Sequence, residues 1–132
     1  ASLMKGVPMI YNGQEVGTPY RLTFPFTSAD INWTLNPDLK AEYKRILAFR
    51  NSSAAIRGGT LTSFSSADVL AFTRELGTEK VFILSNVRNS SISYTLPAAL
   101  SGTGWTNVMT GAPVSLGTSV NLPAYGYLIL KN

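Results

Sequence analysis

After Gly59 the sequence alternates apolar and polar residues, and this period of two constrains the fold more than any other feature. Such alternation over four to eight residues is typical of β-strands with one buried face. Gly, Pro, Asn, Asp and Ser, which favour turns, separate the alternating segments. The predicted strands are residues 60–65, 69–74, 80–85, 91–96, 104–109, 119–122 and 125–130. Short strands at this spacing predict a mainly β unit, an antiparallel sandwich or barrel.

Before Gly59 the period is that of a helix. Asn36-Pro37-Asp38 combines an N-cap residue, a proline at the first helical position and an acid in the first turn. The pattern predicts a helix over 37–57, interrupted near Asn51–Ser53 and ended by Gly58–Gly59. It divides the chain into residues 1–58 and residues 59–132. The helix has an apolar stripe formed by Leu39, Tyr43, Ile46 and Leu47. Arg50 falls on this stripe. Either its stem lies on apolar surface and its charge reaches water, or it clamps the helix to the sandwich through a carboxylate.

The N-terminal segment carries an apolar run, Val7 to Tyr11, that does not alternate. A run of this kind predicts a strand over 7–12 that is covered on both faces, as in parallel sheets. Gly13 then permits a sharp turn and leaves Glu15 at the carboxyl end of the strand. In (β/α)8 barrels that end faces the active site.

Several motifs in register resemble one family. Gly6-x-Pro8-x-Ile10-Tyr11-x-Gly13-x-Glu15 is similar to the eighth barrel strand of α-amylase-type glycoside hydrolases of family 13. Ile31-Asn32-Trp33, Ala48-Phe49-Arg50 and the segment 54–59 resemble the last barrel helix and its exit. Segments 69–74, 80–86 and 122–127 resemble the C-terminal β domain of that family. The resemblance covers nearly the whole chain.

The resemblance implies that the chain is the C-terminal part of a retaining hydrolase of starch and related α-glucans. Residues 1–58 would be a strand, loop and helix remnant of the barrel, and residues 59–132 a Greek-key β-sandwich that stabilises it. The family's three catalytic acids and its calcium ligands would lie upstream, so we expect no catalytic residue and no metal ligand here. The missing part of the barrel would be the partner. Candidate sugar-binding residues at the barrel mouth are Glu15, Tyr20, Arg21 and Trp33.

Two alternatives remain open. The aromatic-rich loop 16–36 either faces sugar or is pinned by its own rings over the barrel core. The β domain either has a structural role only or binds carbohydrate itself, through Trp105 or through Tyr125 and Tyr127. Because the apolar run is costly to expose, we also expect residues 1–15 to dock on the rest of the chain, to self-associate or to be disordered.

Composition excludes other classes of function. With 132 residues, 45% of them hydrophobic and 14% charged, the chain is globular. The net charge is +4, but the basic residues form no stripe along the sequence. This argues against binding of nucleic acid. The chain has no Cys and no His, so the usual metal ligands and general bases are absent, and we expect no cofactor. No apolar run approaches the ~20 residues of a membrane span. The compartment stays open, and a starch-degrading parent fits an extracytoplasmic location.

Overall fold

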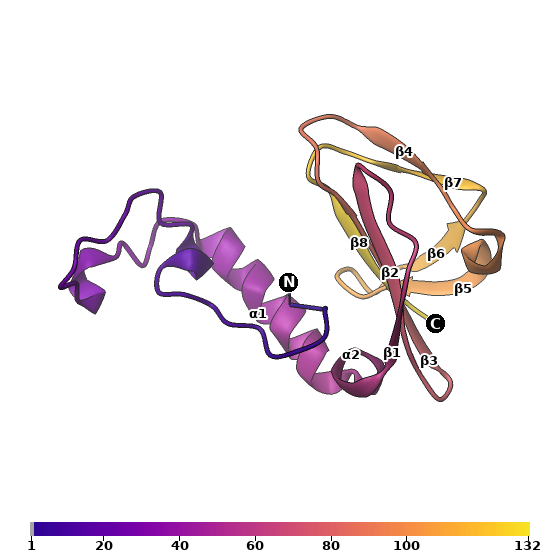
Figure 1. Ribbon diagram of the computed structural model, residues 1–132, viewed down its shortest axis with the longest axis horizontal. Coiled ribbons are helices and arrows are strands. Elements are labelled where there is room, and N and C mark those ends of the chain that lie inside the picture. The colour runs from indigo at the N-terminus through magenta and orange to yellow at the C-terminus, as the bar shows by residue number, and fades with distance from the viewer. Residues whose placement is uncertain (1) are drawn as a thin grey trace. The chain divides into compact units, whose positions relative to one another are not determined.

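The computed structural model describes residues 2–132, and Ala1 lies outside the described part (Figure 1). The chain forms two compact units, divided between Ser52 and Ser53. This division precedes the boundary expected at residues 58 and 59, because the short helix that follows Ser53 packs on strands of the second unit. None of the described helices has the length and apolarity that a membrane span requires.

The first unit contains two 3-10 helices, η1 (Gln14–Val16) and η2 (Ser28–Asp30), and one long helix, α1 (Pro37–Ser52). The start of α1 at Pro37 agrees with the capping signal in the sequence. The strand expected at residues 7–12 is absent: this segment has no regular secondary structure. A strand exists only through backbone hydrogen bonds to a neighbouring strand, and no strand is found among the described residues of this unit.

Arg50 ties the N-terminal segment to α1. Its guanidinium is buried, with 9% of the residue exposed. Nη1 donates to the backbone carbonyl oxygens of Ser2, at 2.7 Å, and Met4, at 3.2 Å, and Nη2 donates to that of Gly6. Neither of the two roles expected for Arg50 is therefore observed. Its partners are main-chain oxygens of its own unit, because an unpaired segment leaves carbonyl groups that a guanidinium with five donors can satisfy.

The second unit begins with α2 (Ala54–Gly58). Ser53 breaks the helical run and caps α2: its Oγ accepts a hydrogen bond from the backbone N–H of Ile56 at 3.1 Å. The break near Ser53 and the end at Gly58–Gly59 agree with the sequence. Gly59 cannot carry a side chain, because a Cβ there would lie 2.5 Å from the backbone oxygen of Ala55.

The remainder is antiparallel β-structure in two sheets. A six-stranded sheet has the order β1-β2-β3-β8-β5-β6, and a two-stranded sheet pairs β4 with β7. The strands are β1 (Thr60–Ser63), β2 (Val69–Leu76), β3 (Glu79–Asn86), β4 (Ile92–Thr95), β5 (Gly102–Asn107), β6 (Pro113–Leu116), β7 (Ser119–Leu122) and β8 (Tyr127–Lys131). The final strand enters the large sheet between β3 and β5, which is the long return connection of a Greek key.

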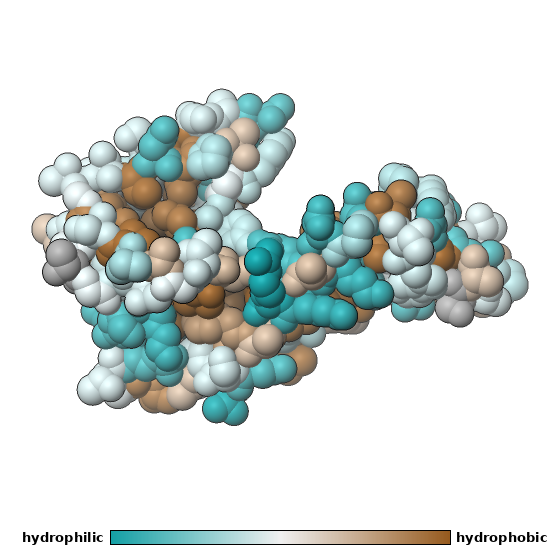
Figure 2. Space-filling view, turned by 180° about the vertical axis from the view of Figure 1, so that it is seen from behind, coloured by the Kyte–Doolittle hydropathy of each residue, from teal (hydrophilic) through white to brown (hydrophobic). Residues whose placement is uncertain are grey.

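The large sheet is covered on both faces. One face packs against the small sheet and forms the main core, which includes Val69, Phe82, Leu84, Tyr94, Trp105, Leu122 and Leu130. On the other face, α2 contacts β2 and β3, where Phe72, Val81 and Ile83 are buried. Figure 2 shows hydrophobic side chains at the surface of this unit as well. Some hydrophobic residues that pack against the core, such as Phe64 and Val120, are only partly buried.

Candidate functional site

A pocket in the first unit is built on a turn with two glycines. Gly13 (φ 84°) and Gly17 (φ 63°) flank η1 in the left-handed region, which favours glycine. At Gly13 a Cβ would also lie 2.4 Å from Oγ1 of Thr18. The side-chain amide of Asn36 donates to the carbonyl oxygen of Val16 at 2.7 Å, which fixes the turn to the start of α1. The chain thereby reverses and places residues 11–14 opposite residues 20–26.

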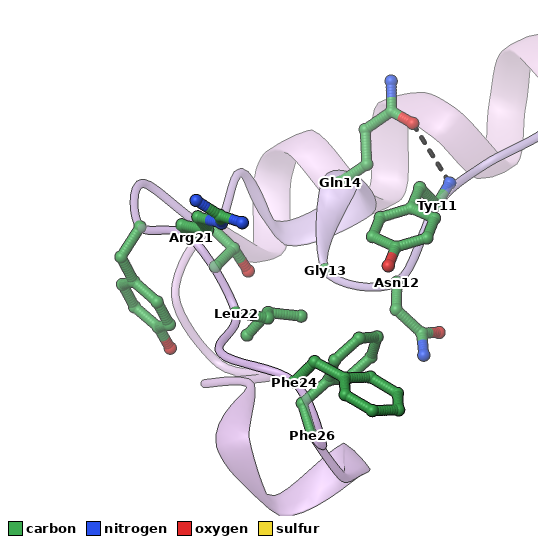
Figure 3. Close-up of a pocket in the computed structure, with 10 residues that line it drawn as sticks. Tyr11, Asn12, Gly13, Gln14, Arg21, Leu22, Phe24 and Phe26 are labelled. Atoms are coloured by element: carbon green, nitrogen blue, oxygen red, sulfur yellow. Dashed lines mark hydrogen bonds between the residues drawn. The ribbon is translucent and has the colours of Figure 1, made fainter.

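Between these two segments lies an open hollow of about 630 Å³ (Figure 3). Tyr11 packs edge-on against Phe26, with ring centroids 6.3 Å apart at 66°. Phe24 leaves 88% of its surface exposed, and Tyr11 leaves 57%. The remaining lining comes from Asn12, Gly13, Gln14, Thr18, Tyr20, Arg21 and Leu22. Exposed rings beside amide and guanidinium groups suit a ligand with apolar faces and a polar rim, as a sugar has.

The structure brings together two of the four candidate residues. Tyr20 and Arg21 both line the hollow, and Tyr20 is held by a 3.0 Å hydrogen bond from its hydroxyl to the carbonyl oxygen of Asp30. Glu15 and Trp33 are outside the lining. Glu15 lies in η1 with its Oε2 buried and without a hydrogen-bond partner in the described part of the chain.

The sequence did not single out Tyr11, Phe24 and Phe26 as site residues, although the abundance of aromatic residues in loop 16–36 was visible. Tyr11 falls in the predicted strand 7–12. Its contact with Phe26 depends on a chain reversal at Gly13 and Gly17 that local sequence patterns specify only weakly.

The carboxylates of the β unit have structural partners. Glu79 is the most enclosed, with 17% of its side chain exposed. It accepts hydrogen bonds from Oγ of Ser53 at 2.7 Å and from the backbone N–H of Ala55 at 3.1 Å, and Nζ of Lys131 lies 3.2 Å away. Burial opposes ionisation of Glu79, but these hydrogen bonds and the lysine charge outweigh it, so the pKa lies below its ordinary value.

Two further carboxylates of this unit form exposed ion pairs, Asp68 with Arg88 and Glu75 with Lys80. Within residues 2–132, no group of three or more Asp and Glu side chains is arranged to hold a metal ion.

Three aromatic residues of the β unit were candidates for sugar binding. Trp105 is a core residue: 8% of it is exposed, its ring lies 6.0 Å from that of Phe82, and its Nε1 donates to the carbonyl oxygen of Leu100 at 3.2 Å. Tyr127 is half-buried, with a buried hydroxyl. Tyr125 is different, because 65% of it is exposed.

Comparison with known families decides the identity of the β unit. Residues 60–129 match the family described as Maltogenic Amylase, C-terminal domain. The chain belongs to this family. The resemblance to α-amylase-type enzymes in the sequence motifs is thereby confirmed, as is the antiparallel C-terminal domain fold. Among curated proteins, none gives a significant match.

Solved structures that are similar to this chain include three structures of MutB. Trehalulose synthase MutB from Pseudomonas mesoacidophila MX-45 matches with a TM-score of 0.63 at 22% identity over 79% of this chain. A MutB mutant from crystals soaked with trehalulose matches with a TM-score of 0.66 at 22% identity over 80% of this chain. A MutB mutant in complex with the substrate sucrose matches with a TM-score of 0.58 at 21% identity over 76% of this chain. The chain covers 20%, 20% and 22% of these proteins, respectively.

Proposed function

We propose that this chain is the C-terminal part of an α-amylase-like glycoside hydrolase that degrades α-glucans with retention of configuration. The family match over residues 60–129 carries the proposal. A retaining hydrolase needs two carboxyl groups about 5–5.5 Å apart across the scissile bond. In this proposal the upstream part of the barrel supplies both of them, and the present chain is not catalytic by itself.

In this proposal the β unit is structural. Its core is closed by its own two sheets and by α2, with Ser53, Ala55 and Lys131 around Glu79. It therefore offers the catalytic barrel a preformed support at the end of its last helix. Such a role requires no ligand.

Exposed apolar residues in the first unit support the proposal that an upstream part of the protein packs against it. Val7 and Met9 are 95% and 81% exposed, and each would gain on the order of 2 kcal/mol from burial. In the proposal, the missing barrel strands cover this segment. The hollow beside it, with Tyr20 and Arg21, would then lie at the barrel mouth and contact the sugar.

Carbohydrate binding by the β unit is the second candidate function, and one observation favours it. Trp105 is buried in the core and is not available to a ligand, whereas Tyr125 presents its ring to solvent.

An assay of two proteins tests the first proposal. The 132-residue chain and the product of its gene with the upstream coding sequence would each be incubated with soluble starch, and reducing ends would be measured. We expect release only by the longer protein, with the α-anomer appearing first in proton NMR spectra. Starch cleavage by the 132-residue chain would overturn the proposal, as would inactivity of the longer protein on every α-glucan tested.

A further inference from the structure

Tyr125 combines two unusual features. Among the described residues it is the only non-glycine residue with a positive φ, 56°. In the β unit it is also the only aromatic residue that is largely exposed, at 65%. A bulky residue in the left-handed region is disfavoured, and Gly or Asn would adopt it at lower cost. Residues held in such conformations cluster at binding and active sites.

The turn that carries Tyr125 (residues 123–126) is held rigidly. Buried Asn86 donates from Nδ2 to the carbonyl oxygens of Leu122, at 3.3 Å, and Pro123, at 2.8 Å. The backbone N–H of Gly126 donates to Pro123 at 2.9 Å, and a Cβ on Gly126 would lie 2.7 Å from the Pro123 ring. The ring of Tyr125 is therefore presented on a preorganised support, which lowers the entropic cost of binding.

A half-exposed ion pair adjoins this turn. The backbone N–H of Tyr125 donates to the carbonyl oxygen of Arg88 at 3.0 Å. Arg88 donates from Nε to Oδ1 of Asp68 at 2.7 Å and from Nη2 to the carbonyl oxygen of Ala67 at 2.8 Å. The side chains of Arg88 and Asp68 are 51% and 48% exposed. Both can therefore make further hydrogen bonds, and their present contacts fix their orientation.

We propose that Tyr125, Arg88 and Asp68 form a surface site for one glucose unit of an α-glucan, separate from the hollow in the first unit. The C–H face of a hexose stacks on the tyrosine ring, and its hydroxyl groups bond the guanidinium and the carboxylate. The choice of an α-glucan rests on the proposed function. A protein partner fits less well, because one exposed ring and one ion pair fall short of the ~1,000 Å² that a specific interface buries.

The test is a titration of the ¹⁵N-labelled 132-residue chain with maltoheptaose, followed by ¹H–¹⁵N NMR. Within the β unit, we expect shift changes confined to residues 66–68, 87–90 and 123–126. Tyr125→Asn removes the ring but tolerates the positive φ, so its affinity should fall roughly tenfold. Tyr125→Phe retains the ring and should bind like the wild type. Leu76→Asn, at the opposite end of β2, is the control for loss of an exposed apolar side chain, and its affinity should not change.

Absence of shift changes at 10 mM maltoheptaose would overturn the proposal, as would equal binding by the wild type and Tyr125→Asn. Tyr125→Asn must retain the dispersed spectrum of a folded domain, and a gain in thermal stability is expected from relief of the backbone conformation. The titration involves no hydrolysis. Its failure would therefore leave the starch assay unaffected, and failure of the starch assay would not remove an observed binding site.

Discussion

The carboxylate of Glu79 accepts a hydrogen bond of 2.7 Å from the hydroxyl of Ser53, the residue that caps α2. Its second oxygen accepts from the backbone N–H of Ala55 in the first turn of the same helix, at 3.1 Å. Glu79 begins β3, so this side chain joins the helix at the start of the β unit to the hairpin between β2 and β3. This joint adds to the packing of α2 on β2 and β3, in which Ala55 and Ile56 are fully buried.

Replacing Glu79 with Gln should destabilise the β unit by about 1–2 kcal/mol, because one acceptor and the charge facing Lys131 are lost. The pKa of Glu79 is lowered in the folded state, so its contribution is fully present above the unfolded value of about 4.3 and is lost as pH falls through the folded value. The difference between wild type and variant should therefore shrink under acid conditions. Urea unfolding followed by Trp105 fluorescence, in a Trp33→Phe background, measures it.

The matched control is Glu75→Gln, in the same hairpin. Glu75 faces Lys80 at 3.4 Å with 42% of its side chain exposed, and exposed pairs of this kind contribute little. Equal losses of stability in the two variants, or a Glu79→Gln effect that does not change between pH 7 and pH 3, would contradict the role assigned to Glu79.

Arg50→Lys should release the N-terminal segment while leaving α1 intact. A lysine ammonium cannot reach three carbonyl oxygens in the fork geometry of a guanidinium, so the carbonyl groups of Ser2, Met4 and Gly6 lose their shared donor. Heteronuclear ¹H–¹⁵N NOE values in residues 3–10 should fall, because the segment loses the hydrogen bonds that order its backbone. Arg45→Lys is the control on the same helix, since the Arg45 side chain is 60% exposed. Unchanged NOE values in Arg50→Lys would show that other contacts hold the segment.

Arg50 also shows where prediction from sequence ends. Its place on the apolar stripe correctly indicated that the charge is unusual. Its partners lie 44 to 48 residues away, however, and are main-chain oxygens that carry no signature in the sequence. For residues 7–12 the apolar run predicted a strand, but a strand requires pairing that this unit does not provide. The sequence predicted the helix more accurately, because caps, breaks and periodicity are local signals.

Asn86→Asp should destabilise the β unit by about 3 kcal/mol at neutral pH. Nδ2 of Asn86 donates to the carbonyl oxygens of Ser90, Leu122 and Pro123, so a carboxylate oxygen in its place would face three acceptors. Only the other oxygen would keep a donor, the backbone N–H of Arg88. Protonation relieves this, which raises the folded-state pKa of the new carboxyl group. The deficit should therefore decrease below pH 5. The deficit of Glu79→Gln also decreases in acid, but there the wild-type carboxylate takes up the proton, whereas here the carboxylate of the variant does. Urea unfolding at pH 4 and pH 7 measures both cases.

Asn89→Asp makes the same substitution at an exposed position of the same loop and should change stability by less than about 0.5 kcal/mol. A mild and pH-independent effect of Asn86→Asp would show that the loops hold together without this amide.

In the β unit, the strands were largely predictable from sequence because period two and turn residues are local signals. The exception is β6, Pro113–Leu116, which none of the predicted strands covers. Proline is tolerated there because β6 is an edge strand. The sites were harder to predict. Tyr20 and Arg21 line the hollow together with the ring of Tyr11, which the turn at Gly13 and Gly17 brings opposite them. The turn that carries Tyr125 depends on hydrogen bonds with Asn86 and Arg88, which are distant in the sequence.

The exposed apolar residues of the first unit predict self-association in the absence of the proposed upstream partner. Val7, Met9 and Phe24 are each more than 80% exposed, and burial of all three would contribute roughly 6 kcal/mol. Sedimentation equilibrium should show the average mass rising between about 1 and 100 µM. The triple variant Val7→Ser, Met9→Ser, Phe24→Ser should remain monomeric over that range, whereas Leu76→Ser, which removes an exposed leucine from the β unit, should associate like the wild type. A wild-type chain that stays monomeric while residues 7–11 resist hydrogen exchange would contradict this prediction, because rigid, exposed apolar residues would then persist without a partner.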